Sequence, residues 1–116
     1  MMKVLIVADD LTGALDTASQ FGEALVLLDL SAGLDSRVVA LSTNSRKFTP
    51  GDAYEKLRTL LISLPKPKYL YKKVDSTMRG NVGAELKAVT EIVGKPVPFT
   101  PAFPEQGRIV VNGELI

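Results

Sequence analysis

The fold is decided by the stretch KVLIVADDLTGALD at residues 3–16. Its first part, residues 3–8, is an apolar run rich in β-branched side chains, which predicts a strand buried on both faces. Apolar residues then recur at helical spacing, and the helix they predict ends near Gly22. The members of this apolar stripe are Leu11, Leu15, Ala18 and Phe21. A strand, a polar loop and a helix are therefore expected in succession.

The same alternation continues along the chain. Further strands are predicted at residues 24–28, 37–41 and 69–74, and a short edge strand at 96–100. Because parallel strands need long crossovers between them, the alternation predicts an α/β fold with a mainly parallel sheet flanked by helices. At roughly 100 to 200 residues per domain, residues 1–116 are expected to form a single domain.

Two more helices are predicted from their caps and apolar stripes. Thr49 and Pro50 mark the start of the second helix, and Gly94 marks the end of the third. The predicted stripes are Ala53, Leu57, Leu60 and Leu64 in the second helix, and Val82, Leu86, Val89 and Val93 in the third.

The last nine residues follow a different pattern. Asn112-Gly113 between two short apolar arms predicts a β-hairpin with a type I′ turn. Its second arm has only the residues 114–116 and ends on apolar side chains. The hairpin is therefore interpreted as truncated or completed by another chain, with a naturally short strand as the alternative.

Composition excludes several classes of function. Fourteen basic and thirteen acidic residues give a net charge of +1, too little for the positive field that nucleic acid or an anionic membrane selects. The chain has no cysteine and no histidine, which removes thiolate nucleophiles, zinc-thiolate sites and imidazole bases. No apolar run approaches the roughly 20 residues that span a bilayer. We therefore expect a cytoplasmic protein with no nucleic-acid or membrane partner, whose acid–base groups are Asp, Glu, Lys or Tyr.

Polar clusters follow the predicted strands, at residues 9–10, 42–46, 75–79 and 100–108. The carboxyl ends of parallel strands share one edge of a sheet, and open α/β folds bind ligands in the crevice outside that edge. Four loops are therefore expected to converge on one ligand site.

Asp9 and Asp10 stand between the first strand and the first helix. One carboxylate in this position can bind a substrate hydroxyl and act as a base, while its neighbour orients the backbone or holds Mg²⁺ through water. The alternative is that either aspartate only caps the helix.

The segment from Lys72 to Gly83 is the densest cluster. Lys72 and Lys73 point to opposite faces of their strand, so only one of them can serve a given site. Asp75, Ser76 and Arg79 lie ahead of the next helix, where hydroxyls, backbone N–H groups and a guanidinium can bind a small acid. The alternative is a capped helix start with an exposed Asp75–Arg79 ion pair.

Two other loops carry weaker signals. A proline-bracketed loop ends in Gly107 and Arg108, and it either presents this arginine at a fixed position or is an ordinary turn. The polar residues Asn44, Ser45 and Arg46 are interpreted as a solvated loop. The sequence contains neither G-x-x-x-x-G-K-[ST] nor G-x-G-x-x-G, so it encodes no nucleotide site of these kinds.

Three motifs in this order resemble the four-carbon acid sugar kinases. They are ADDLTGA at residues 8–14, YKKVDSTMRGN at 71–81, and PAFP at 101–104 followed by Gly107 and Arg108. The resemblance covers almost the entire chain, and the second motif is the most specific. It implies an ATP-dependent kinase of sugar acids such as threonate, erythronate or oxo-tetronates. Such kinases have an N-terminal acid-binding domain and a C-terminal ATP-binding domain, and this chain resembles most of the first and none of the second.

The resemblance also implies roles for residues of this chain. Asp9 would be the catalytic base, and the acid substrate would lie near Asp75, Arg79 and Arg108. Together with the residues proposed above from the polar clusters, the expected substrate-binding set is Asp9, Asp10, Lys72, Asp75, Ser76, Arg79, Gly107 and Arg108. No cofactor-binding or metal-binding residue is expected in this chain. ATP and Mg²⁺ would be bound mainly by the missing domain, in the same chain or in another, and a homo-oligomer is compatible with this arrangement.

Two other functions remain open at this point. A receiver domain of a signalling system has a similar length and an acidic pair after its first strand. It also needs an aspartate after the third strand, where this chain has Ser42 and Thr43, and a lysine after the fifth, where it has Thr100 and Pro101. The other alternative is a fragment that binds a sugar acid or a partner subunit without catalysis.

Overall fold

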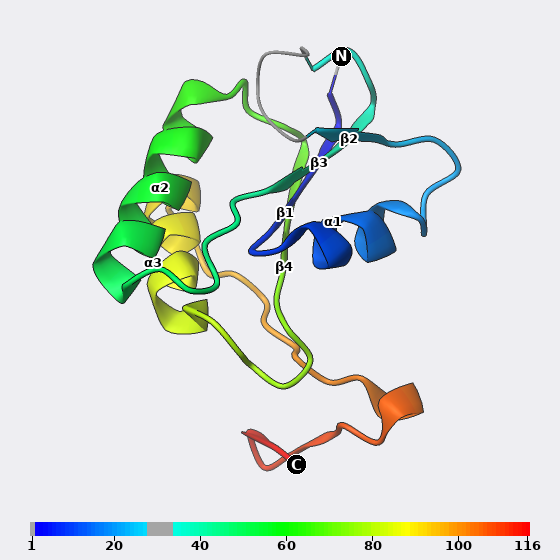
Figure 1. Cartoon of the computed structure of the whole chain (residues 1–116), viewed down its shortest axis with the longest axis vertical. Coiled ribbons are helices and arrows are strands. Elements are labelled where there is room, and N and C mark those ends of the chain that lie inside the picture. The colour runs from blue at the N-terminus through cyan, green and yellow to red at the C-terminus, as the bar shows by residue number, and fades with distance from the viewer. Residues whose placement is uncertain (1, 28–33) are drawn as a thin grey trace.

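A four-stranded sheet with helices on both faces forms the body of the protein, as seen in a computed structural model that describes residues 2–27 and 34–116 (Figure 1). The strands lie in the order β2-β3-β1-β4, and every pairing is parallel. The α/β prediction is therefore confirmed. In chain order the elements are β1 (Val4–Ala8), α1 (Leu11–Ala18), β2 (Leu25–Leu27), β3 (Val38–Ser42), α2 (Pro50–Ser63), β4 (Tyr69–Lys73) and α3 (Val82–Val93).

The central strand β1 contributes to two hydrophobic clusters, one on each face of the sheet. Leu5 and Val7 pack with the apolar side chains of α2 and α3. Ile6 and Ala8 pack with the alanines of α1. Figure 1 shows α2 and α3 on one side of the strands and α1 on the other. β1 is buried on both faces, as predicted, and its carboxyl end therefore lies in the middle of the sheet edge.

Helix α1 is shorter than predicted and turns a different face to the sheet. It ends at Ala18, so Phe21 and Gly22 lie beyond it. Leu11 and Leu15 are 37% and 48% exposed, whereas its buried residues are Gly13, Ala14 and Ala18. The predicted stripe was correct at Ala18 and wrong at Leu11, Leu15 and Phe21. Small side chains let the helix approach the sheet closely, which leaves the larger leucines at its margin.

The predicted caps of the other two helices are confirmed. The Thr49 hydroxyl accepts a hydrogen bond from the Asp52 N–H, and Gly94 ends α3 in the left-handed conformation. The predicted stripe of α2 is correct at Ala53 and Leu57, which are fully buried, and at Leu64, which is buried just beyond the helix. At the third position Leu61 is buried and the predicted Leu60 is only half-buried. In α3 the buried residues are Glu85, Ala88 and Val89, so the packed face includes a carboxylate that the apolar pattern did not indicate.

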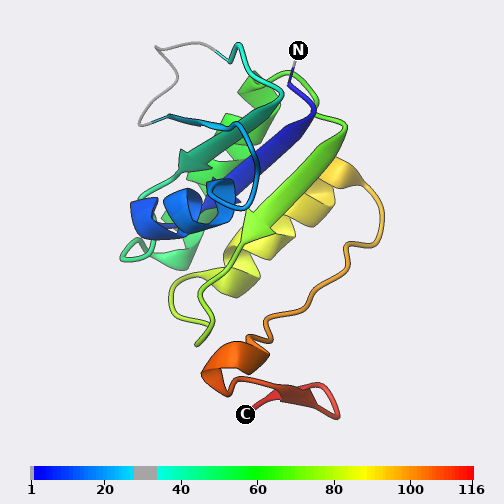
Figure 2. The same ribbon diagram turned by 90° about the vertical axis from the view of Figure 1, so that its right-hand side faces the viewer.

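The C-terminal segment confirms one prediction and corrects another. Residues 96–100 form no strand. Pro96 and Pro98 lack the N–H donors that an edge strand would use, which explains the wrong prediction. The hairpin is present as β5 (Val110–Val111) and β6 (Glu114–Leu115), and both Asn112 and Gly113 have the positive φ of a type I′ turn. It lies apart from the main sheet in both views (Figure 2).

The predicted strands at 24–28, 37–41 and 69–74 are observed with ends shifted by one residue or so, and position 28 falls outside the described residues. Among the described helices, none has the length and apolar character needed to cross a membrane.

Candidate functional site

Two aspartates occupy the carboxyl end of β1. Asp9 follows the strand directly and is buried, and its backbone carbonyl accepts a hydrogen bond from the Ser45 N–H at 3.1 Å. Asp10 caps α1, because its Oδ1 accepts a hydrogen bond from the Gly13 N–H at 2.8 Å. The capping interpretation is therefore correct for Asp10. Its other oxygen, Oδ2, stays available and faces Arg46.

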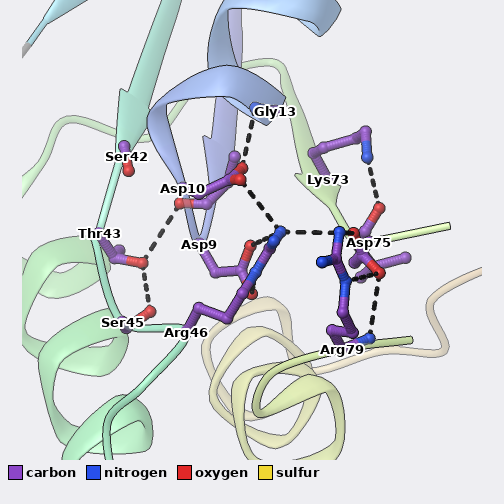
Figure 3. Close-up of polar contacts among 12 residues, drawn as sticks. Asp9, Asp10, Gly13, Ser42, Thr43, Ser45, Arg46, Lys73, Asp75 and Arg79 are labelled. Carbon is purple, nitrogen blue, oxygen red and sulfur yellow. Dashed lines mark hydrogen bonds and ion pairs between the residues drawn. The ribbon is translucent and has the colours of Figure 1, made fainter. Parts of the chain in front are cut away.

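Arg46 joins the carboxylates of three separate residues (Figure 3). Its Nη2 lies 3.1 Å from Asp9 Oδ1, 3.2 Å from Asp10 Oδ2 and 3.5 Å from Asp75 Oδ1. Its Nε donates a longer hydrogen bond, of 3.4 Å, to Asp9 Oδ2. The hydrogen bond to Asp9 raises the pKa of Arg46 above its usual value, and the charges of all three carboxylates act in the same direction. A single guanidinium thus connects the loops after β1, β3 and β4.

The loop after β4 is organised around Asp75. Arg79 binds this carboxylate with two hydrogen bonds, from Nε to Oδ2 at 2.9 Å and from Nη2 to Oδ1 at 2.8 Å. The backbone N–H of Thr77 donates a third, at 3.1 Å. The hydrogen bond from Arg79, with those from Thr77, holds the pKa of Asp75 far below its usual range. The Arg79 side chain remains 67% exposed, so the guanidinium can also meet a solute.

Gly80 lets this loop close over Asp9. Its φ is +91°, and a Cβ at this position would lie 2.5 Å from Asp9 Oδ2 and 3.3 Å from Arg46 Cγ. Met78 in the same loop also has a positive φ, of 63°. The approach of the backbone to Asp9 therefore depends on the absence of a side chain at Gly80.

The two lysines of β4 point to opposite sides, as predicted. The Lys72 ammonium lies beneath the loops, 3.2 Å from Glu85 Oε1, and both side chains are almost fully buried. Lys73 lies on the α1 side, where its Nζ donates a hydrogen bond to the Val74 carbonyl. Burial raises the pKa of Glu85, while the Lys72 charge opposes that shift.

The loop after β3 lies at the edge of the sheet where it was predicted, but two of its residues are not solvated as expected. Ser45 is completely buried and Arg46 lies at the centre of the cluster, so the expected solvated loop was wrong at these two positions. The signal was present, since both residues follow a predicted strand. What the sequence lacked was the strand order, which places β3 beside β1.

The remaining predicted residues are placed differently. Ser76 is half-buried in the loop after β4, next to Asp75. Gly107 ends a short 3-10 helix (Pro104–Gln106), and the Arg108 guanidinium donates a hydrogen bond to the Gln106 side chain. The orange segment with this 3-10 helix lies beyond the carboxyl end of β4 in Figures 1 and 2. Within residues 2–27 and 34–116, no hydrogen bond or ion pair joins Gly107 or Arg108 to the cluster around Arg46. The structure thus brings together three of the four predicted loops.

The arrangement suits a polyhydroxylated anion better than a metal ion. Three carboxylates offer acceptors for hydroxyl groups, and the exposed Arg79 offers a bidentate donor for a carboxylate. Arg46 already supplies the cation that these carboxylates share. In the described part of the chain, no group of three or more potential metal-ligating side chains is arranged to hold a metal. With Arg46 as their shared counter-charge, these carboxylates can accept hydrogen bonds from hydroxyl groups.

The fold and the cluster together define an α/β domain with a group of paired charged side chains at the carboxyl edge of its parallel sheet. The chain belongs to the family described as the sugar-binding N-terminal domain, whose sequence model matches residues 4–116.

Relatives from three bacteria cover nearly the whole chain. This chain is 34% identical to a D-erythronate kinase of Heliobacterium modesticaldum, and the match covers 100% of this chain and 29% of that protein. It is 37% identical to a D-threonate kinase of Cupriavidus necator, over 97% and 29% of the two chains. A D-threonate kinase of Bordetella bronchiseptica is 39% identical, over 95% and 31%. The chain thus spans less than a third of the length of these relatives.

One solved structure is similar in fold and in sequence. It is a domain of unknown function from Bordetella bronchiseptica, described as a domain-swapped dimer with bound citrate. The TM-score is 0.85 and the identity 35%, over 97% of this chain and 32% of that one. The resemblance inferred from the three motifs is confirmed by these relatives.

Proposed function

We propose that residues 1–116 are the acid-binding portion of an ATP-dependent kinase that phosphorylates four-carbon sugar acids of the threonate, erythronate or oxo-tetronate type. The observation that carries this proposal is the convergence of Asp9, Asp10 and Asp75 on Arg46, with Arg79 beside them, at the carboxyl edge of the sheet. The names of the relatives supply the acids. The proposed setting is the cytoplasm, where ATP is available.

Each group in the cluster has a proposed task. The carboxylates of Asp9, Asp10 and Asp75 accept hydrogen bonds from the hydroxyls of the acid, and Asp9 removes the proton from the hydroxyl that becomes phosphorylated. Arg79 binds the carboxylate of the acid, with the Ser76 hydroxyl beside it. Arg46 keeps the three carboxylates in place and neutralises part of their charge, so that an anion can approach.

The remaining predicted residues complete the proposal. Arg108 and Gly107 reach the bound acid when the C-terminal segment closes on the cluster, and Lys72 supports the site from below. ATP and Mg²⁺ are bound mainly by a further domain, in the same chain or in another. That assignment is supported by the short span of this chain against its relatives and by the absence of both nucleotide motifs from its sequence. The domain-swapped dimer of the structural relative supports a homo-oligomer.

The second candidate is binding without catalysis, which the same short span favours for this chain alone. The two are separated by incubating the chain with ATP, Mg²⁺ and D-threonate or D-erythronate. A phosphorylated acid shows that the chain is a complete kinase. Binding without product assigns it the acid-binding role only.

Calorimetric titration of D-threonate and D-erythronate into the protein tests the site. Charged hydrogen bonds contribute about 1.5 to 3 kcal/mol each, so Arg79→Ala should weaken binding roughly tenfold to a hundredfold. Lys87→Ala is the matched control, because Lys87 is an equally exposed cation on the outer side of α3. Equal affinity of the Arg79 variant and the wild type would remove Arg79 from the proposed site.

A further inference from the structure

Beneath the cluster lies a buried pair of charges that the proposed chemistry does not use. Lys72 projects from β4 and Glu85 from α3, and their side chains are only 6% and 2% exposed. The Lys72 Nζ lies 3.2 Å from Glu85 Oε1 and donates a hydrogen bond of 2.9 Å to the carbonyl of Lys73. A solute at the carboxyl edge of the sheet therefore meets neither charge unless the loops move.

Ser45, the neighbour of Arg46 in the chain, is fully buried, as is Glu85. The Ser45 hydroxyl lies close enough to Glu85 to lower the pKa of that carboxyl, against the larger effect of burial. It also shares a hydrogen bond of 2.6 Å with the Thr43 hydroxyl. The Ser45 N–H is bound to the Asp9 carbonyl, and the next residue is Arg46.

A second contact from α3 reaches the same segment. Asn81, at the start of this helix, makes no capping hydrogen bond with its side chain. Its Nδ2 instead donates to the Ser45 carbonyl at 3.2 Å and to the Phe48 carbonyl at 2.8 Å. Helix α3 therefore holds the loop after β3 through Asn81, which lies one turn before Glu85 and whose carbonyl accepts a hydrogen bond from the Glu85 N–H at 2.9 Å. Displacing Glu85 would thus also displace the contact that Asn81 makes with the segment carrying Arg46.

Stability alone does not explain this pair. Taking two charges out of water is costly, and replacing a whole buried pair with neutral groups is often neutral or stabilising. The geometry of this pair is also imperfect, because Glu85 Oε1 accepts no well-aligned hydrogen bond from any residue that the structure describes. Because the pair is costly and its geometry is imperfect, its contribution is better explained by the position it gives to the neighbouring segment with Ser45 and Arg46.

We infer that Lys72 and Glu85 are positioning residues, which hold the Ser45–Arg46 segment against Asp9 and support acid binding without touching the acid. The inference rests on the proposed function for its ligand. Two roles for Lys72 can be told apart. If Lys72 touches the acid, replacing it abolishes that contact whatever stands at position 85. If Lys72 acts only through its pairing with Glu85, replacing both residues together should restore binding.

The experiment compares Lys72→Met, Glu85→Gln and the double variant with the wild-type chain, with Lys87→Met as a control on the exposed side of α3. Calorimetry gives the affinity for D-threonate, thermal unfolding shows that each variant is folded, and ¹H–¹⁵N spectra report the amide signals of Ser45 and Arg46. Each single variant should weaken binding about tenfold and shift both amide signals, as expected for coupling within one network. In the double variant both signals and most of the affinity should return towards wild type.

Two outcomes overturn the inference. If the double variant binds as weakly as Lys72→Met while Glu85→Gln binds normally, Lys72 is a direct ligand. If the Ser45 and Arg46 signals are unchanged in both single variants, the pair does not position this segment, and that result holds even if the wild type binds no sugar acid. Absence of binding by the wild type counts against the proposed function, and the amide signals still decide the inference.

Discussion

Replacing Gly80 with alanine tests the geometry of the cluster with a single added methyl group. Two effects are expected. The first is backbone strain, because Gly80 has a φ of +91°. A residue with a Cβ in the left-handed region costs about 1 to 2 kcal/mol. The second is a contact, since the new Cβ would lie 2.5 Å from Asp9 Oδ2.

The contact is the effect that reaches the site. An ordinary carbon–oxygen contact is about 3.3 Å, so the Asp9 carboxylate or the Gly80 backbone must move by about 0.8 Å. Asp9 is buried and bound to Arg46, so it cannot turn aside without weakening that hydrogen bond. A charged hydrogen bond is worth about 1.5 to 3 kcal/mol, and partial loss should lower the free energy of unfolding by about 1 kcal/mol beyond the strain. Affinity for D-threonate should fall about tenfold, since Asp9 is displaced.

Gly94→Ala supplies the matched control. Gly94 has a φ of +71°, and a Cβ there would meet nothing within 4 Å. Its substitution carries the backbone strain without the contact. Urea denaturation and calorimetry should therefore show that Gly94→Ala loses about 1 to 2 kcal/mol of stability and keeps its affinity. If the two alanine variants lose equal stability and bind D-threonate equally well, Gly80 does not adjoin Asp9 in the way described.

Three further predictions follow from the same contacts. Asp75→Asn should remove stability at neutral pH, and its difference from the wild type should shrink only as the pH falls below about 4, because a carboxyl with a lowered pKa stabilises the fold fully above the pKa of the unfolded chain and loses that contribution as the pH falls towards its own lower pKa. Urea denaturation from pH 2 to 7 measures the difference, and a difference that already shrinks between pH 7 and pH 5 would contradict the prediction. Arg46→Met should cost roughly 1.5 to 3 kcal/mol at pH 7, because Asp9 and its neighbours lose their shared cation, and unchanged denaturation midpoints would show that the cluster is not coupled. Thr49→Ala should cost about 1 kcal/mol through loss of the α2 cap and leave acid binding intact, which thermal unfolding and calorimetry check together.

Local patterns in the sequence predicted most of the fold. The β-branched run before Asp9 predicted the central strand, and Thr49 and Gly94 marked helix ends, because these signals act within a few residues. The face of α1 was not predictable in the same way. Its packing depends on how closely Ala14 can approach the sheet, and spacing alone favours the larger Leu15.

The candidate site was predicted in part for a related reason. Asp9, Asp75 and Arg79 were found because they follow predicted strands. Arg46 and Glu85 were missed because their importance depends on strand order and on which side of α3 faces β4. A charged residue in an otherwise apolar helical face is the signal that would have indicated Glu85.

An NMR titration of the ¹⁵N-labelled chain with D-threonate tests directly whether a sugar acid binds at the carboxyl edge of the sheet. We expect that the amide signals that move belong to the loops after β1, β3 and β4, at residues 9–10, 45–46 and 75–80. The opposite end of the sheet offers a comparison, because a hollow there is lined by residues that include Lys3, Arg37 and Tyr69. If signals move at that end while those around Asp9 and Arg46 stay in place, the acid does not bind at the cluster around Arg46.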